Sequence, residues 1–171
     1  MKKDIAKRFE KIYGVPHFHY DVEWWKTEDG YNDDVAEILD NAFRMLEEFP
    51  DFTYVIDQVL SLKPYWDAHP EMHERIRGWI SEGRLEIVGG TWCSPDENLP
   101  TGEALVRQYV AGKRFCRTEL GCSPVTAWEI DAFGHPAQFA QIMAGCGMKG
   151  FVFARGVQDW RSASEPLHFK W

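Results

Sequence analysis

The stretch VPHFHYDVEWW, residues 15–25, places two histidines, an aspartate and two tryptophans at the end of an apolar run. That run, IYGVPHF at residues 12–18, predicts a β-strand. Similar runs recur along the chain and alternate with helical patterns, which is typical of β/α units on a parallel sheet. The further predicted strands are Phe52–Ile56, Leu85–Gly90, Val125–Ile130 and Gly150–Ala154, with LHFKW at residues 167–171 as a sixth candidate.

The segments between these strands carry helical periodicity. In NDDVAEILDNAFRMLEEFP, residues 32–50, apolar side chains recur at helical spacing behind an Asn-Asp cap. No repeat, low-complexity segment or linker interrupts the chain, so residues 1–171 are predicted to form one domain of the α/β class. Shorter helices are expected at about Ser61–Trp66, Pro70–Ser81, Gly102–Glu119 and Pro136–Gly145.

The composition argues against several classes of partner. The 171 residues include 19 Lys and Arg against 27 Asp and Glu, and this net charge of −8 argues against nucleic acid or an anionic membrane. No run reaches about 18 uncharged apolar residues, so neither a membrane span nor a signal peptide is expected, and the chain is predicted to be cytoplasmic. Four dispersed cysteines without a C-x-x-C pair predict reduced thiols. Eight tryptophans exceed what such a core needs, and aromatic faces stack well on sugars.

Functional residues in such sheets gather just past the carboxyl ends of the strands. Alternation along an extended segment directs His17, His19 and Asp21 to one side, and Phe18 and Tyr20 to the other. Imidazole and carboxylate both suit a zinc-like ion, so the set predicts part of a metal site. The alternative is a strand-end loop whose polar residues only hydrogen-bond to one another.

A second carboxylate occupies an equivalent position in AWEIDAFGHP, residues 127–136. Asp131 follows the predicted fourth strand and is interpreted as a metal ligand, a nucleophile or both, with a helix cap as the alternative. His135, just before a proline, is interpreted as structural, and Glu129 is left without a role. Asp96 and Glu97 either face a ligand or solvate their loop, and the second interpretation is favoured. HPEMH at residues 69–73 is not expected to bind metal, because its proline places the first histidine outside the helix.

Three motifs resemble glycoside hydrolase family 38, the α-mannosidases, in its N-terminal catalytic domain. They are PHFHYDVEW at 16–24, EGRLEIVGGTWCSPDENLPTGEALVRQYVAGKRF at 82–115 and WEIDAFGH at 128–135, in the family's order. The resemblance implies a seven-stranded β/α barrel of the glycoside hydrolase/deacetylase type, incomplete in this chain. It also implies a retaining hydrolase of terminal α-mannosidic bonds and one divalent metal ion, normally zinc, at the hydroxyls of a bound mannose.

The resemblance also implies roles for individual residues. The metal ligands are expected to converge on one ion, and aromatic side chains are expected beside the sugar. Carried over by position, the roles are metal ligands for His19, Asp21 and Asp131, catalytic nucleophile for Asp131, its partner for Arg155, and substrate contacts for Trp24 and Phe133.

Two departures from the family pattern shape the expected activity. Glu23 and the acidic stretch behind it leave substrate preference open. The family's fourth ligand, a histidine, and its acid/base aspartate are expected beyond Trp171, while His168 is interpreted as an ordinary strand residue. The chain alone is therefore not expected to hydrolyse α-mannosides, and its open sheet edge favours a homo-oligomer. A metal-dependent carbohydrate deacetylase and a non-catalytic carbohydrate-binding fragment are the alternatives.

Overall fold

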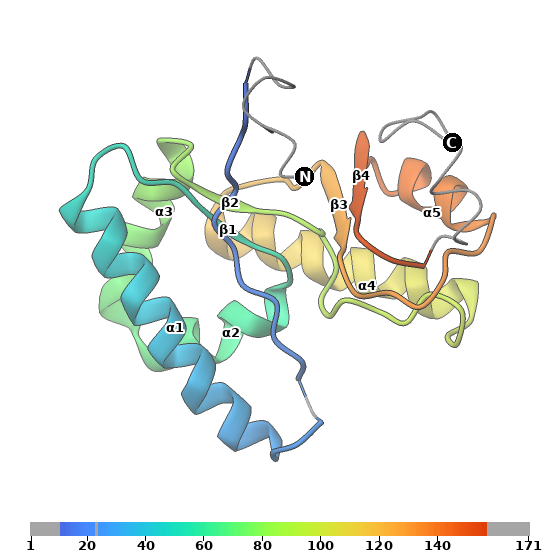
Figure 1. The fold of residues 1–171 in the computed structure, drawn as a ribbon, viewed down its shortest axis with the longest axis horizontal. Helices are drawn as coiled ribbons and strands as arrows, with labels where there is room; N and C mark the ends of the chain where they lie inside the picture. Colours follow the sequence, from blue (N-terminus) through green and yellow to red (C-terminus); the bar gives the residue numbers. More distant parts are fainter. Residues whose placement is uncertain (1–10, 23, 157–171) are drawn as a thin grey trace, which may run out of the picture.

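The computed structural model describes residues 11–22 and 24–156 (Figure 1). Helices and short strands alternate along this part of the chain, which confirms the α/β class. The elements are α1 (Glu28–Glu48), β1 (Tyr54–Ile56), α2 (Val59–Ala68), the 3₁₀ helix η2 (Pro70–Met72), α3 (His73–Ser81), β2 (Leu85–Ile87), α4 (Gly102–Phe115), the π-helical segment η3 (Cys116–Leu120), β3 (Thr126–Glu129), α5 (Phe139–Gly145) and β4 (Gly150–Phe153).

The strands form two small parallel sheets, β1 with β2 and β3 with β4. The Gly89 amide donates to the Thr126 carbonyl at 2.8 Å, and this bond joins the end of β2 to β3. On the other side of β1, His17 forms an isolated parallel bridge with Val55. The N-terminal segment, β1, β2, β3 and β4 therefore lie side by side in chain order (Figure 1).

The first predicted strand is wrong as an element, because residues 12–18 contribute only the bridge at His17. Pro16 has no N–H to donate, and its carbonyl accepts from the Val55 amide at 3.0 Å. The other four predicted strands are present and one to three residues shorter. Strand β2 ends at Ile87, before Gly89 and Gly90, which adopt positive φ. The candidate strand LHFKW, with His168, lies outside the described residues.

The five predicted helical segments are present with shifted ends. Helix α1 begins at Glu28, and the Thr27 hydroxyl accepts from the Gly30 amide at 3.4 Å. The predicted Asn-Asp cap is therefore wrong, and both residues lie inside the helix. The second segment is longer than predicted, the third is divided into η2 and α3, the fourth gives way to η3 after Phe115, and the fifth begins at Phe139.

Strand β1 is buried along its whole length and β3 over its last three residues, whereas Glu86 in β2 and Val152 in β4 are exposed. Helices α1, α2 and α3 cover one face of β1 and β2, with Leu39, Ile56 and Ile76 among the fully buried side chains (Figure 1). A smaller cluster joins α4 and α5 to β3, and Val55, Val88 and Trp128 form a third. All four cysteines are free thiols, as predicted. Within the described ranges, no helix has the length and apolar character needed to cross a bilayer.

Candidate active site

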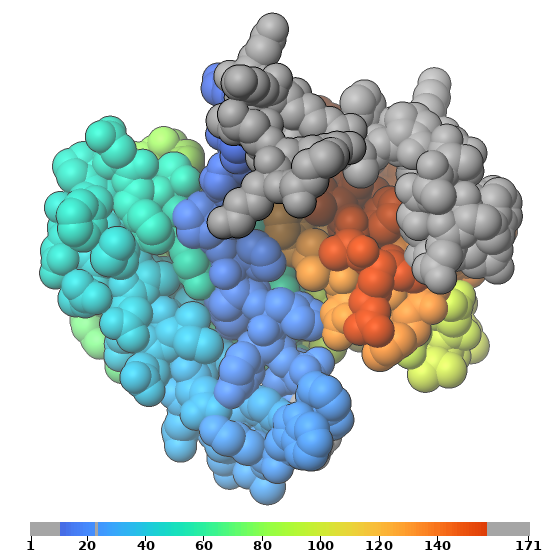
Figure 2. Space-filling view, viewed as in Figure 1, coloured from blue at the N-terminus to red at the C-terminus, as the bar shows by residue number. Residues whose placement is uncertain are grey.

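Charged side chains gather where the parallel strands end. Asp57 directly follows β1, Asp131 lies two residues after β3, and Arg155 lies two residues after β4. The segment that carries His19 runs beside β1, and Figure 2 shows this segment (blue) on the surface between α1 and the β3–β4 region (orange to red). The carboxyl ends of parallel strands meet at one edge, which is where α/β proteins place their functional groups.

Buried contacts hold the loops at this edge in register. The Gln58 side chain is 2% exposed; it donates to the Tyr20 carbonyl at 3.3 Å and accepts from the Ser94 amide at 2.9 Å. The loop after β2 passes so close to β1 that a Cβ on Gly89 would lie 2.2 Å from the Asp57 carbonyl oxygen. Gly89 also has φ +71°, which favours glycine. The segment around His19 is thereby tied to the ends of β1 and β2.

The predicted alternation of side chains is present although no ladder forms. Phe18 and Tyr20 pack against the main core, on the side of β1 covered by α1. His19 points the other way, toward the strand-end acids. The His17 ring lies edge-on to Trp128 with centroids 5.3 Å apart. Local extended geometry is sufficient to sort these side chains.

His19 lies between two carboxylates. Its Nδ1 is 3.5 Å from Asp57 Oδ2, and its Nε2 is 4.0 Å from Asp131 Oδ2. The interaction with Asp57 raises the pKa of His19, burial opposes this, and the charges of Asp57, Asp21 and Asp131 add to the increase. Nε2 is buried and has no hydrogen-bond partner among the described residues. This nitrogen is therefore able to bind a metal ion or to form a hydrogen bond with a bound molecule.

Asp131 and Arg155 are brought into contact from successive strands. The Arg155 guanidinium contacts Asp131 Oδ1, and its Cζ lies 4.7 Å from the centroid of the Phe133 ring. Phe133 is 69% exposed, so one face of this group is open. Phe133 and the exposed Asp131–Arg155 pair thus form one surface with a charged and an aromatic part.

The two remaining predicted site residues lie on the same N-terminal segment. Asp21 is exposed and close enough to His19 for its charge to raise the pKa of that histidine. Trp24 is 69% exposed and packs on Trp25, with ring centroids 4.9 Å apart. Neither is buried in the core, so both are available to a ligand.

Asp57 is a site residue that the sequence analysis did not identify. It is 1% exposed, and neither carboxylate oxygen has a hydrogen-bond partner within the described ranges. A signal for it was available, since Asp57 follows an apolar strand in FTYVIDQ much as Asp131 follows one in VTAWEID.

Two further buried acids lie beneath the site. Glu129 is 2% exposed; burial and the charges of Glu97 and Asp57 raise its pKa well above the usual range. Glu97 is 1% exposed, and both of its carboxylate oxygens lie 3.0 Å from His135 Nδ1. The interpretation of Glu97 as a solvated loop residue is wrong, because its carboxylate is shielded from water and paired with a histidine.

The donor atoms at this edge are an imidazole nitrogen and carboxylate oxygens. Within residues 11–22 and 24–156, no three His, Cys, Asp or Glu side chains are already arranged as a metal-binding group. The buried, unpartnered Nε2 of His19 nevertheless faces an Asp131 oxygen, and imidazole with carboxylate is a donor set that zinc accepts. The residues present fit part of a zinc site.

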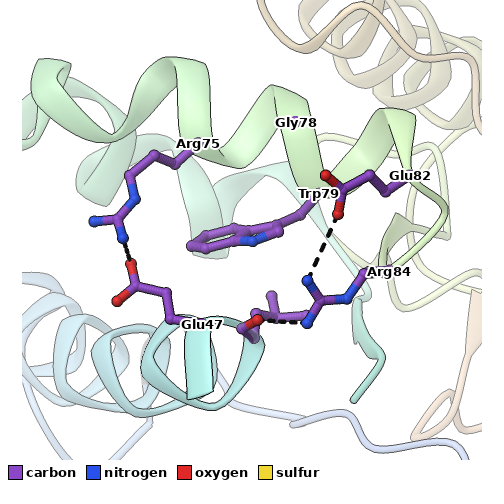
Figure 3. A pocket seen from close by; sticks show the side chains of 7 residues that line it. Glu47, Arg75, Gly78, Trp79, Glu82 and Arg84 are labelled. Atoms are coloured by element: carbon purple, nitrogen blue, oxygen red, sulfur yellow. Dashed lines mark hydrogen bonds and ion pairs between the residues drawn. The ribbon is translucent and has the colours of Figure 1, made fainter. Parts of the chain in front are cut away.

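A pocket of about 380 Å³ lies elsewhere, on the helical side of the molecule (Figure 3). Trp79 lies between two ion pairs, Glu47 with Arg75 and Arg84 with Glu82. The charges that line the pocket are therefore paired within it. Because residue 84 immediately precedes β2, the pocket lies at the amino end of that strand, opposite to the candidate active site.

The fold and site define a class, the α/β proteins that carry their active site at the carboxyl ends of parallel strands. Residues 10–171 match the family model described as glycosyl hydrolases family 38 N-terminal domain, and the chain belongs to this family. The resemblance found in the sequence is thereby confirmed.

Named relatives agree with this assignment. Alpha-mannosidase 2 of Spodoptera frugiperda is 33% identical over 98% of the chain, and alpha-mannosidase 2C1 of Mus musculus is 35% identical over 82%. The chain spans only 15% and 14% of these two relatives. An alpha-mannosidase from Enterococcus faecalis V583 has a TM-score of 0.77 at 27% identity, covering 84% of this chain and 16% of that one. A 4-alpha-glucanotransferase from Thermococcus litoralis, at TM-score 0.67 and 20% identity, covers 91% of this chain and 24% of that one, and shares the fold alone.

Proposed function

We propose that the full-length protein is a retaining glycoside hydrolase that cleaves terminal α-mannosidic bonds. Residues 1–171 would form the N-terminal part of its seven-stranded β/α barrel. Membership of family 38 and the α-mannosidase names of the relatives support the substrate class. The order of parallel strands, each neighbouring the next in the chain, supports the barrel.

The observation that carries the proposal is the position of Asp131. Its carboxylate contacts the Arg155 guanidinium through one oxygen and faces His19 with the other. In a retaining mechanism such a carboxylate attacks the anomeric carbon while the bond to the leaving oxygen breaks and an acid protonates that oxygen. Water then hydrolyses the glycosyl ester and gives its proton back to the acid, now acting as base. The contact with Arg155 orients the Asp131 carboxylate for attack.

His19, Asp21 and Asp131 would hold zinc in this proposal. When bound, zinc would fix two hydroxyls of the sugar and favour its distortion toward the transition state. The exposed faces of Trp24 and Phe133 would contact the apolar side of the sugar ring, as aromatic side chains do. The deacetylase alternative would instead need water activated at the same donors.

The experiment compares the full-length protein with its Asp131→Asn variant on an activated aryl α-mannoside with added zinc. We expect turnover to fall by at least about 10³-fold with the fold intact, because Asn cannot form the ester intermediate. Asp51→Asn, in the loop before β1, is the matched control and retains activity. NMR of the first-formed sugar should show retention at the anomeric carbon. Normal turnover in Asp131→Asn, inversion, or release of acetate without glycosidic cleavage would contradict the proposal.

A further inference from the structure

Glu97 and His135, which have no role in the proposed mechanism, contact each other in the structure. Glu97, in the loop after β2, places both carboxylate oxygens 3.0 Å from His135 Nδ1, in the loop after β3. The two side chains are 0% and 6% exposed, so this Glu97–His135 pair is buried. It joins loops that are 38 residues apart.

The other ring nitrogen of His135 reaches a third loop. Nε2 lies 2.9 Å from the carbonyl oxygen of Arg155, after β4. A carbonyl oxygen only accepts, so Nε2 carries the hydrogen of this bond, and an ionised Glu97 requires a hydrogen on Nδ1 as well. Burial alone lowers the pKa of His135, but the hydrogen bonds to Glu97 and to the Arg155 carbonyl raise it overall. The geometry fits an imidazolium that donates from both nitrogens.

Arg155 connects this buried pair to the proposed nucleophile. Its backbone carbonyl is held by His135, while its guanidinium contacts Asp131. The Arg155 side chain is 52% exposed and its guanidinium contacts Asp131, so the rotamer that makes this contact depends on where the Arg155 backbone lies. The direction from which the guanidinium approaches Asp131 therefore depends on the backbone position that His135 sets.

The packing of the loops supports this connection independently. Gly156 has φ +87°, and a Cβ there would lie 2.8 Å from His135 Nε2 and 3.0 Å from the Ala132 carbonyl oxygen. A Cβ on Gly134 would lie 2.3 Å from Asn98 Nδ2. The loops after β3 and β4 approach so closely that a side chain at Gly156 is strained, and a side chain at Gly134 would displace the Asn98 amide of the loop after β2.

We propose that Glu97 and His135 are positioning residues, which act through the Arg155 carbonyl to hold the Arg155 guanidinium against Asp131. The catalytic consequence rests on the proposed function, in which Asp131 is the nucleophile. A small displacement of a reacting group costs up to about 10²-fold in rate, so loss of this alignment lowers kcat more than it changes KM.

The first test needs no catalysis and uses NMR of the 171-residue chain. We expect both ring nitrogens of His135 to show imidazolium shifts at pH 6, below the ordinary histidine pKa of 6.5, and the Arg155 guanidinium protons to exchange slowly. Glu97→Gln should accelerate that exchange by about 10-fold or more, as the bond at His135 weakens. Glu103→Gln, on the exposed face of α4, is the matched control and leaves the exchange unchanged.

A second variant separates the loop contact from the carboxylate. Gly156→Ala inserts a Cβ against His135 Nε2, whereas Gly121→Ala has a similar positive φ, +73°, and nothing within 4 Å. Both carry the same backbone strain, so only Gly156→Ala is expected to release Arg155. Unchanged guanidinium exchange in folded Glu97→Gln and Gly156→Ala would overturn the positioning role.

The third measurement is kinetic, in the full-length protein. Glu97→Gln should lower kcat by about 10- to 100-fold and leave KM within about threefold. If Asp131→Asn is inactive while Glu97→Gln keeps its kcat, the positioning role is wrong and the proposed function stands. If Asp131→Asn is fully active, the proposed function fails, and the catalytic part of this inference fails with it.

Discussion

Two histidine–carboxylate pairs lie at the strand ends, and they differ in how many of the histidine ring nitrogens have a hydrogen-bond partner. In the Glu97–His135 pair, both ring nitrogens have acceptors at 2.9–3.0 Å and the histidine side chain is 6% exposed. In the His19–Asp57 pair, Nδ1 is 3.5 Å from the carboxylate, Nε2 has no hydrogen-bond partner among the described residues, and the histidine side chain is 29% exposed.

The difference separates a fully hydrogen-bonded pair from one with a ring nitrogen that is unpartnered within the described ranges. Buried polar groups are normally hydrogen-bonded, and one left open needs an explanation. Both ring nitrogens of His135 have acceptors, so we call the Glu97–His135 pair the closed pair, and its hydrogen bonds link three loops. The His19–Asp57 pair leaves a donor atom facing Asp131, as a metal-binding histidine with a carboxylate behind it does.

Breaking the closed pair is expected to have the largest effect on stability. His135→Phe leaves Glu97 buried without its partner, and removing one member of a buried ion pair costs about 3–5 kcal/mol. His73→Phe is the control, because the ring of His73 has one hydrogen bond within the described ranges, to the Trp66 carbonyl, and Phe can keep its stacking on Trp66; about 1 kcal/mol is expected there. Denaturant unfolding of both variants measures the difference. A loss below 1 kcal/mol in His135→Phe would show that the closed pair does not stabilise the loops.

Variants of the His19–Asp57 pair are expected to lower the affinity for zinc. Asp57→Asn keeps the shape of the side chain and removes its charge, so zinc binding should weaken by about 10- to 100-fold, as for other carboxylates behind a metal-binding histidine. His19→Ala should weaken it further, and Asp51→Asn should not change it. Isothermal titration with zinc and the ring-nitrogen shifts of His19 provide independent measurements. Equal affinities in Asp57→Asn and the original chain would remove Asp57 from the site.

The smallest expected effect is on the pH dependence of stability. The pKa of His135 is raised above 6.5, so its contribution is complete below pH 6.5 and is lost as pH rises through the folded-state value. Burial raises the pKa of Glu97, which acts in the same direction. Tm should therefore fall by about 2–4 °C between pH 6 and pH 8.5, the shift that about 1 kcal/mol produces in a domain of this size. Glu97→Gln should flatten the profile, and an equally steep profile in that variant would contradict the assignment.

The sequence predicted those features of the fold that depend on residues close together in the chain. Apolar runs located β1 to β4, and alternation placed Phe18 and His19 on opposite sides. The helix cap at Thr27 was missed because the Asn-Asp pair offers an equally good local signal a few residues later.

Long-range contacts were beyond that reasoning. The position of Asp57 after an apolar strand was a usable signal, but its contact with His19, 38 residues earlier, is seen only in the fold. Glu97 and His135 are separated by 38 residues, and no spacing rule connects them. Burial decides whether a carboxylate is a solvated loop residue or a charged partner, and burial is a property of the folded chain.

The Gly89–Thr126 hydrogen bond affects how firmly the two sheets are held together. It joins two sheets whose strands otherwise pair only within each sheet in the described part of the chain. Each sheet is held by a ladder of backbone bonds, whereas β2 and β3 themselves meet through this backbone contact and through side-chain packing at Val88 and Trp128. Between β2 and β3, backbone hydrogen bonding is therefore sparser than within either sheet, and the buried Glu97–His135 pair adds a second connection between the loops that follow these strands.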